Sequence, residues 1–327
     1  MSDSLVDEHR LSVWLDGCAI AEGEPLLVER LDAGRSNAMF TIQRGDRDLV
    51  LRRPAGVAVD RANEGMRREY RILRALDASD VPHPEAIALC EDPAVLGCTF
   101  FVMERVDGIN PMPPLPDVFA SNEVRAGVAF AMVDVLAAIH SFDWQAGGLS
   151  DLGRPDGFHE RQVDRWTRQL WSYGGRVLPG IDSVAQWLST NRPNSFTPTL
   201  MHGDFHMFNL LIAEGPPGKV TAVVDWETAT IGDPLLDLAG FCEIWCPLTA
   251  EGWPSRHELE SRYAEARGIE LPRSFGYYDA LYNFRMAVLL EGIHQRSLRD
   301  PTRPDLVEVG DRALANVSRA LEAVSRS

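Results

Sequence analysis

The sequence has 327 residues, 45% of them hydrophobic, which is enough for one large domain or two ordinary ones with packed cores. Its formal net charge of −16 argues against nucleic acid and anionic membranes as partners, because proteins bind both polyanions through clusters of Lys and Arg. Five cysteines at irregular spacing indicate free thiols, and neither a signal peptide nor an apolar run of membrane-spanning length is found. We therefore expect a soluble, cytoplasmic protein whose oligomeric state the sequence leaves open.

The N-terminal part predicts a helix and then strands that flank a glycine-containing loop. Apolar residues at helical spacing predict a helix over residues 8–17, and residues 28–31 and 39–43 predict two strands. In the loop between these strands, a glycine would let backbone N–H groups approach a phosphate, and polar side chains could add donors. A plain β-turn is an equally good interpretation. The loop residues concerned are Gly34, Arg35, Ser36 and Asn37.

A strand, a helix and a buried strand follow. Residues 49–53 predict a strand that ends in two adjacent arginines. An amphipathic helix is predicted over residues 62–77, with Glu69 beside its apolar face. Residues 100–104 predict a buried strand, and four prolines between residues 111 and 116 indicate a crossing into a second lobe.

The rest of the chain is mainly helical by periodicity. Long helices are predicted over residues 124–141, 281–296 and 306–324, and residues 145–198 predict an inserted helical segment rich in Gly, Pro and Trp. One polar face of this segment either lines a substrate cleft or is a solvated face with an anchoring indole. That face carries Gln162, Arg165, Trp166 and Gln169.

The most informative stretch begins at His202-Gly-Asp204. Asp204 and Asn209 have the spacing of a kinase-type catalytic loop, in which the aspartate faces the hydroxyl to be phosphorylated and the asparagine holds Mg²⁺. Asp225 ends a predicted strand and would supply a second metal oxygen, and a Gly-Pro turn at 214–218 predicts a hairpin between them. The alternative is a buried polar turn without chemistry, because the motif fixes only a few positions.

Three neighbouring residues are interpreted as supports. His202 is expected to be structural, because a histidine base here would compete with a better placed carboxylate. Asp233 and Asp237 are expected to hydrogen-bond the catalytic segment and to cap the next helix.

These motifs resemble those of the aminoglycoside phosphotransferase/choline kinase family, in particular bacterial phosphotransferases akin to the kinase domain fused to some acyl-CoA dehydrogenases. The resemblance covers nearly the whole chain. It implies an α+β, two-lobed, protein-kinase-like fold with a β-rich N-lobe over residues 1–107 and a larger, mainly helical C-lobe over residues 108–327. It rests on Gly34-Arg-Ser-Asn37, Leu49-Val-Leu-Arg-Arg-Pro54, Arg68-Glu-Tyr-Arg-Ile-Leu73, Val102-Met-Glu-Arg-Val-Asp-Gly108, Gln162-x-x-x-Trp166, His202-Gly-Asp204 and Gly232-Asp-Pro-Leu-Leu-Asp-Leu-Ala239.

The resemblance implies an ATP- and Mg²⁺-dependent phosphotransferase in which Asp204 accepts the proton of the attacking hydroxyl. Asn209 and Asp225 would hold Mg²⁺.

The resemblance also implies how the nucleotide is bound. Where relatives usually have a phosphate-binding lysine, this sequence has Arg52 followed by Arg53, and which guanidinium faces the nucleotide is open. Glu69 would pair with Arg52. The hinge that reads the adenine edge would lie at Met103, Glu104 and Arg105.

The acceptor is expected to be a small molecule with a hydroxyl group. The resemblance favours a hydroxy acid or hydroxyacyl-CoA, whereas an acidic surface would suit an aminoglycoside; an antibiotic kinase for aminoglycosides or macrolides is therefore the alternative. A nucleotide-binding pseudokinase is a third alternative, against which the complete catalytic set argues. Residues expected to contact the substrate are Arg165, Trp166 and Arg285, with Glu227 reaching either the metal or only the loop.

Overall fold

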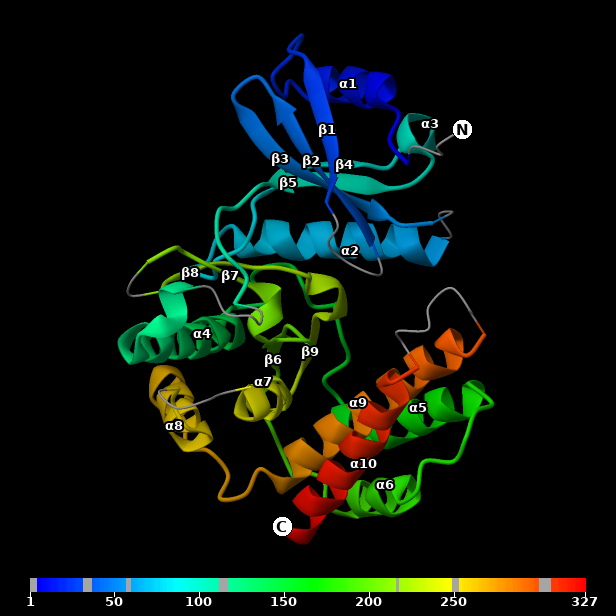
Figure 1. Cartoon of the computed structure of the whole chain (residues 1–327), viewed down its shortest axis with the longest axis vertical. Helices are drawn as coiled ribbons and strands as arrows, with labels where there is room; N and C mark the ends of the chain where they lie inside the picture. Colours follow the sequence, from blue (N-terminus) through cyan, green and yellow to red (C-terminus); the bar gives the residue numbers. More distant parts are fainter. Residues whose placement is uncertain are drawn as a thin grey trace. The chain divides into compact units, whose positions relative to one another are not determined.

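A computed structural model describes residues 5–31, 37–56, 60–111, 117–215, 218–248, 253–299 and 307–327 (Figure 1). Contacts divide the chain into two compact units, each assembled from segments far apart in the sequence. Unit 1 comprises residues 1–138, 142–149 and 207–228, and unit 2 comprises residues 139–141, 150–206 and 229–327. This division differs from a single boundary after residue 107, because a helix beyond the hinge and the segment with Asn209 and Asp225 group with the N-terminal sheet.

Unit 1 is built on a five-stranded antiparallel sheet. Its strands are β1 (Leu26–Leu31), β2 (Asn37–Arg44), β3 (Arg47–Pro54), β4 (Ala86–Cys90) and β5 (Phe100–Glu104), in the order β1-β2-β3-β5-β4. Successive side chains of a strand point to opposite faces, so Phe100 and Phe101 face different neighbours. The ring of Phe100 lies 4.9 Å from that of Trp14, and the ring of Phe101 lies 6.1 Å from that of Tyr70. Helices α1 (Glu8–Gly17) and α2 (Asp60–Leu76) therefore cover opposite faces of the sheet (Figure 1).

The face under α1 carries an apolar core. Leu11 and Leu15, one helical turn apart, are fully buried there, and the short helix α3 (Pro93–Leu96) packs beside α1. Arg44 of β2 is also buried and pairs with Asp16 of α1 at 2.5 Å. These contacts explain why a helix with few apolar residues is held on the sheet.

The remainder of unit 1 contains the 3-10 helix η1 (Asp117–Ala120), most of α4 (Asn122–Ser141) and a hairpin of β7 (Leu210–Ile212) and β8 (Val220–Val223). Two further 3-10 helices flank the hairpin, η2 (Met207–Asn209) and η3 (Trp226–Thr228). By length and composition alone, α4 is long and apolar enough to cross a membrane. The prediction that no apolar run reaches this length is therefore wrong, although core helices of soluble proteins pass the same test and half of its most apolar stretch is buried.

Unit 2 is mainly helical. Its strands β6 (Thr199–Met201) and β9 (Thr230–Gly232) pair antiparallel, so the segment that precedes the Asp204 loop runs beside the segment that precedes the helix at residues 235–248. The long helix α9 (Gly276–Ser297) packs along α10 (Val309–Ser325) (Figure 1). The helices of this unit are α5 (Phe158–Ser172), α6 (Ile181–Thr190), α7 (Leu235–Leu248), α8 (Arg256–Arg267), α9 (Gly276–Ser297) and α10 (Val309–Ser325).

Most predicted elements are present. The predicted helix over residues 8–17 and the predicted strand over residues 100–104 coincide with α1 and β5, and the predicted hairpin is formed by β7 and β8. The phosphate-loop candidates Gly34, Arg35 and Ser36 lie outside the described residues, so their role stays a prediction.

Candidate active site

Unit 1 contains a cavity of about 640 Å³ between the sheet and the hairpin. Apolar side chains such as Met39, Val50 and Leu211 contribute much of its lining. A largely apolar cavity with a few convergent polar groups is typical of a small-molecule site. The polar residues that line it include Asn37, Arg52, Glu69, Asn110, Asn209, Asp225 and Glu227.

Arg52 is 6% exposed and lies among three carboxylates. Its Nε is 2.9 Å from Oε2 of Glu69, and its Nη2 is 2.7 Å from Oδ1 of Asp225 and 3.6 Å from Oε2 of Glu227. The predicted pairing of Arg52 with Glu69 is therefore present. One positive charge beside three carboxylates leaves an excess of negative charge in the cavity.

The neighbouring arginine faces away from this cavity. Because side chains alternate along β3, Arg53 points to the opposite face from Arg52. Its guanidinium donates to the carbonyl oxygens of Leu5 and Pro54. The geometry therefore assigns the cavity to Arg52.

Burial alters the acid–base properties of Glu69. Desolvation raises the pKa of this fully buried carboxyl, and the nearby charge of Arg52 lowers it only in part, so the pKa is about 7. Burial alone would lower the pKa of Arg52, but Glu69 and Asp225 outweigh it and raise that pKa above its ordinary value. Arg52 is thus a permanent cation, whereas Glu69 changes its charge near neutral pH.

Asn209 and Asp225 lie at the same end of the hairpin. Asn209 immediately precedes β7, and the N–H of Val224 donates to the Asn209 carbonyl at 2.9 Å. Asp225 has a φ of +67°, a conformation that costs a non-glycine residue about 1–2 kcal/mol. Backbone strain at a polar residue in a cavity indicates a functional constraint on that residue.

The hinge residues Met103, Glu104 and Arg105 line the cavity, as predicted, together with Val106. Two hinge N–H groups are already used. Glu104 donates to the Glu85 carbonyl at 2.9 Å, and Arg105 donates to the Asp48 carbonyl at 3.3 Å. The next N–H, on Val106, has no hydrogen-bond acceptor among the described residues, so the free donor lies one residue beyond the predicted hinge.

In unit 2, Asp204 belongs to the loop that follows β6, and Asp237 of α7 fixes the backbone of that loop. The Asp237 carboxylate accepts hydrogen bonds from the N–H of His202 at 2.7 Å and from the N–H of Gly203 at 3.1 Å. Gly203 has a φ of +81°, which a glycine adopts without strain. These bonds confirm that Asp237 supports the catalytic segment.

Asp233 has a different supporting role. Its Oδ1 accepts a hydrogen bond from the N–H of Leu235 at 3.0 Å, which caps α7 as predicted. Its Oδ2 accepts from Tyr278 and lies 2.9 Å from Nε2 of His159. Asp233 therefore anchors the helix from which Asp237 reaches the loop.

Asp204 lies near one arginine and two histidines. Nε2 of His206 is 3.4 Å from Oδ2 of Asp204. Burial raises the pKa of Asp204, but the hydrogen bond and charge of His206, followed by the charges of Arg285 and His202, outweigh it and leave this pKa below its ordinary value. Asp204 is therefore ionised at neutral pH.

Arg285 is directed at the catalytic loop. Its Nη2 donates to the Gly203 carbonyl at 2.6 Å, and its guanidinium carbon is 5.5 Å from the ring centre of Trp166. Trp166 is buried and donates to Gln162, whereas Arg165 is exposed and 4.9 Å from the same ring. The predicted polar face is thus partly buried packing, and Arg165 retains an accessible charge.

Glu227 belongs to unit 1, not to the unit that holds Arg165, Trp166 and Arg285. Its Oε2 accepts a hydrogen bond from Nδ2 of Asn37 at 3.0 Å. Glu227 is therefore part of the cavity around Arg52.

Residues 27–258 match the phosphotransferase enzyme family. The chain belongs to this family. It is 35% identical over 290 residues to acyl-CoA dehydrogenase family member 10 of Mus musculus, covering 84% of this chain but 27% of that relative. The chain therefore spans well under half the length of this relative.

Solved structures agree with the family assignment. A crystal structure of a candidate aminoglycoside phosphotransferase from Ralstonia eutropha has a TM-score of 0.85 and 29% identity, and the match covers 98% of both chains. A thermostable mutant of aminoglycoside phosphotransferase APH(4)-Ia, in complex with ADP and hygromycin B, has a TM-score of 0.57 and 19% identity over 95% of this chain and 97% of that one. The predicted family and protein-kinase-like fold are confirmed.

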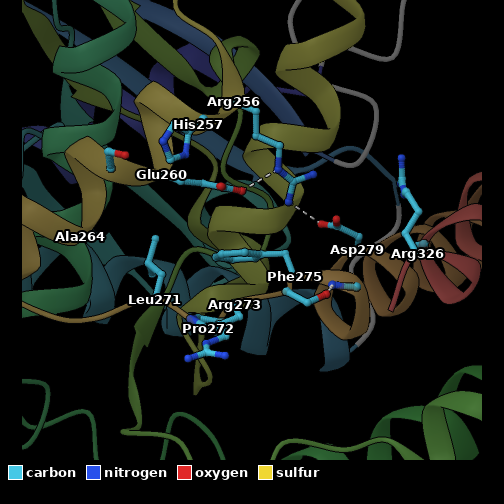
Figure 2. A pocket seen from close by; sticks show the side chains of 14 residues that line it. Arg256, His257, Glu260, Ala264, Leu271, Pro272, Arg273, Phe275, Asp279 and Arg326 are labelled. Atoms are coloured by element: carbon cyan, nitrogen blue, oxygen red, sulfur yellow. Dashed lines mark hydrogen bonds and ion pairs between the residues drawn. The ribbon is translucent and has the colours of Figure 1, made fainter.

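A second cavity of the phosphotransferase, about 530 Å³, lies in unit 2 between α8 and the start of α9 (Figure 2). Arg256 points into it and pairs with Glu260 at 2.6 Å and with Asp279 at 2.7 Å. None of the predicted site residues lines it. We assign this cavity no part in phosphoryl transfer.

Three residues beside the predicted site positions carry no motif that the sequence analysis identified. Val106 and Asn110 line the cavity of unit 1, and His206 approaches Asp204. His206 could have been found from its position two residues after the aspartate. Asn110 carries no such signal, because its contacts are with residues about one hundred positions away.

Proposed function

We propose that this phosphotransferase transfers the γ-phosphoryl group of ATP to a hydroxyl of a small molecule. The observation that carries the proposal is the meeting of Arg52, Asn209 and Asp225 in one largely apolar cavity next to the hinge. Such a cavity suits a base at its apolar end and phosphates at its charged end. Asp204 lies five residues before Asn209 in the sequence, which is the spacing of a kinase-type catalytic loop.

Asn209 and Asp225 are the residues that would hold Mg²⁺. The described residues contain no group of three His, Cys, Asp or Glu side chains able to hold a metal ion. That fits Mg²⁺, which is usually bound by one or two protein carboxylates together with substrate phosphates. The excess of negative charge around Arg52 also favours a divalent cation. When bound, Mg²⁺ would offset the charge that develops on the phosphate oxygens.

The residues of the chain supply positioning and a proton acceptor. Arg52, held by Glu69, would direct its guanidinium at the phosphates, and the N–H of Val106 would donate to the adenine edge. Asp204, ionised and held through the loop backbone, would orient the acceptor hydroxyl and take its proton as the new O–P bond forms. The bond between the γ-phosphorus and the β–γ bridging oxygen of ATP would break in the same transfer, and ADP would leave.

For the acceptor we infer a hydroxy acid or hydroxyacyl-CoA. Similarity to a protein named as an acyl-CoA dehydrogenase family member supports this class, and so does the exposed charge of Arg165. Phosphorylation would turn a poor leaving group into a good one on such a compound. The alternative acceptor is an antibiotic such as an aminoglycoside, which the net charge of −16 and the hygromycin B complex of APH(4)-Ia favour.

Incubation of the purified protein with Mg²⁺ and ATP tests the proposal. Panels of hydroxyacyl-CoAs, free hydroxy acids and aminoglycosides would be screened by mass spectrometry for the addition of one phosphoryl group. Phosphorylation of a hydroxyacyl compound is expected. Turnover of aminoglycosides alone would favour the alternative, and the absence of ATP binding would refute the proposal.

Arg165→Glu should raise KM for an anionic acceptor with little change in KM for ATP, because an accessible charge would be lost on the acceptor side alone. We expect about a tenfold effect, in the range of a charge-assisted hydrogen bond. Arg168→Glu is the matched control, since Arg168 is exposed on the same helix. Equal effects of both substitutions would argue against a specific contact with Arg165.

The activity should also depend on the charge of Glu69. Because its pKa is about 7, the fraction of ionised Glu69 rises through neutral pH, and kcat/KM for ATP should rise with it as Arg52 is held more firmly. Glu69→Gln should remove this rise, whereas Glu64→Gln, on the exposed side of the same helix, should retain it. Profiles of kcat/KM for ATP between about pH 6 and pH 8, measured for the unmodified protein and both variants, would test this dependence.

The raised pKa of Glu69 also affects the free energy of unfolding, in the direction opposite to its effect on kcat/KM. The pKa of Glu69 in the folded state is above its ordinary value, so the stability that this carboxyl contributes is fully present below the ordinary pKa. That contribution is lost as the pH rises to about 7. Activity and the contribution of Glu69 to stability therefore change in opposite directions across this range.

A further inference from the structure

The segment that follows the hinge is fastened to the hairpin of unit 1. Ile109 and Ile212 exchange backbone hydrogen bonds of 2.8 and 2.9 Å. Oγ1 of Thr221 donates to the Asp107 carbonyl at 2.9 Å. A Cβ atom added to Gly108 would lie 2.7 Å from Thr221 Oγ1, closer than real Cβ atoms approach their neighbours. The close approach of the two segments therefore requires glycine at this position.

Asn110 is the last residue of this segment, and its side-chain amide bonds the backbone carbonyls on both sides of Asn209. Nδ2 of Asn110 donates to the Phe208 carbonyl at 2.6 Å and to the Leu210 carbonyl at 3.2 Å. The carbonyl of Asn209 accepts from the N–H of Val224 at 2.9 Å. All three carbonyls around Asn209 are thus held by donors from outside their own segment.

The contacts also fix which end of the Asn110 amide is used. A reversed amide would place Oδ1 against two carbonyl oxygens, neither of which can donate. In the observed orientation Oδ1 is buried and finds no donor among the described residues. Asn110 therefore acts here only as a donor of two N–H bonds.

We propose that Asn110 is a positioning residue for the metal, which fixes the direction in which Asn209 presents its side-chain oxygen to Mg²⁺. The inference rests on the proposed function. Partners that orient metal ligands typically change metal affinity by about 10–100-fold when they are removed. Asp at this position would direct an oxygen at two carbonyl oxygens, and Ala would leave both carbonyls without their donor.

Calorimetric titration of ATP, in EDTA and in Mg²⁺, tests this role without measuring turnover. For Asn110→Asp the readout is the ratio of the two affinities, because Asn110 lines the cavity and a new carboxylate there should also weaken the binding of metal-free ATP. The gain in affinity on adding Mg²⁺ should fall by about tenfold or more, and Asn110→Ala should show a smaller loss. Asn191→Asp makes the same chemical change at an exposed helix end in unit 2 and should leave the gain unchanged.

The outcomes separate the two proposals. If the unmodified protein binds ATP with a gain from Mg²⁺ and both Asn110 variants keep that gain while only melting earlier, Asn110 is merely structural and the inference is overturned. If Asn110→Asp does not fold, Asn110→Ala alone decides by the same comparison. If the unmodified protein shows no gain from Mg²⁺, the proposed function fails and the inference fails with it.

Discussion

Asp204→Asn should lower kcat by about 100-fold or more while nucleotide binding remains nearly unchanged. The factor is that expected for the loss of a positioned general base. The side chains are isosteric, and the loop backbone is held by Asp237 rather than by Asp204, so the fold should survive. Steady-state kinetics with the identified acceptor, combined with calorimetry of Mg²⁺-ATP binding, would measure both quantities.

His206→Gln provides the comparison for Asp204→Asn. It removes a neighbour that lowers the pKa of Asp204 but leaves the carboxylate in place, so its effect should be much smaller. Turnover of Asp204→Asn at the rate of the unmodified protein would show that another group accepts the proton.

Asp225→Ala should abolish the Mg²⁺-dependent part of nucleotide stabilisation and lower kcat/KM by at least about 100-fold, because one of the two proposed protein ligands of the metal is lost. Thermal unfolding with ATP, in the presence and absence of Mg²⁺, measures the first effect. Asp225→Asn tests whether the turn or the charge matters, since Asn also tolerates a positive φ. It should retain the backbone of the turn and still lose most of the metal effect.

Asp80→Ala is the matched control for Asp225, because the Asp80 side chain is exposed on the same unit and does not line the cavity. It should leave the Mg²⁺-dependent shift in melting temperature intact. A shift that persists in Asp225→Ala would rule out Asp225 as a metal ligand.

Local sequence patterns predicted many of the helices and strands, because the spacing of apolar residues and the identity of turn residues depend only on nearby positions in the sequence. The continuous apolar run over residues 100–103 placed β5, and the helical spacing of Leu11 and Leu15 placed α1. The same holds for the hairpin, whose strands are separated in the sequence by a segment that contains Gly and Pro. The pairing of Arg52 with Glu69 came from the resemblance to a family, and the geometry bears it out.

Features that depend on contacts across the sequence were not predictable in this way. Which arginine of β3 faces the cavity depends on the pairing of Arg52 with Phe101 and on the face that α2 covers. Carbonyl groups on β3 and before β4 accept from the N–H groups of Arg105 and Glu104, which no motif specifies. Among the described residues this leaves Val106 as the next hinge donor. Arg285 has an appropriate charge for substrate, but its contact with the Gly203 carbonyl is visible only in three dimensions.

At Asp225 the proposed function and the stability of the fold favour different residues. Glycine would adopt the observed φ of +67° at little cost, so the fold alone favours glycine here, whereas a carboxylate is retained at a cost of about 1–2 kcal/mol. Natural proteins are only marginally stable, so this loss in the free energy of unfolding reduces the number of further destabilising mutations that the chain can accept. A lineage that lost the need for this carboxylate would gain mutational tolerance by replacing it, which makes this position a sensitive record of whether selection still maintains the reaction.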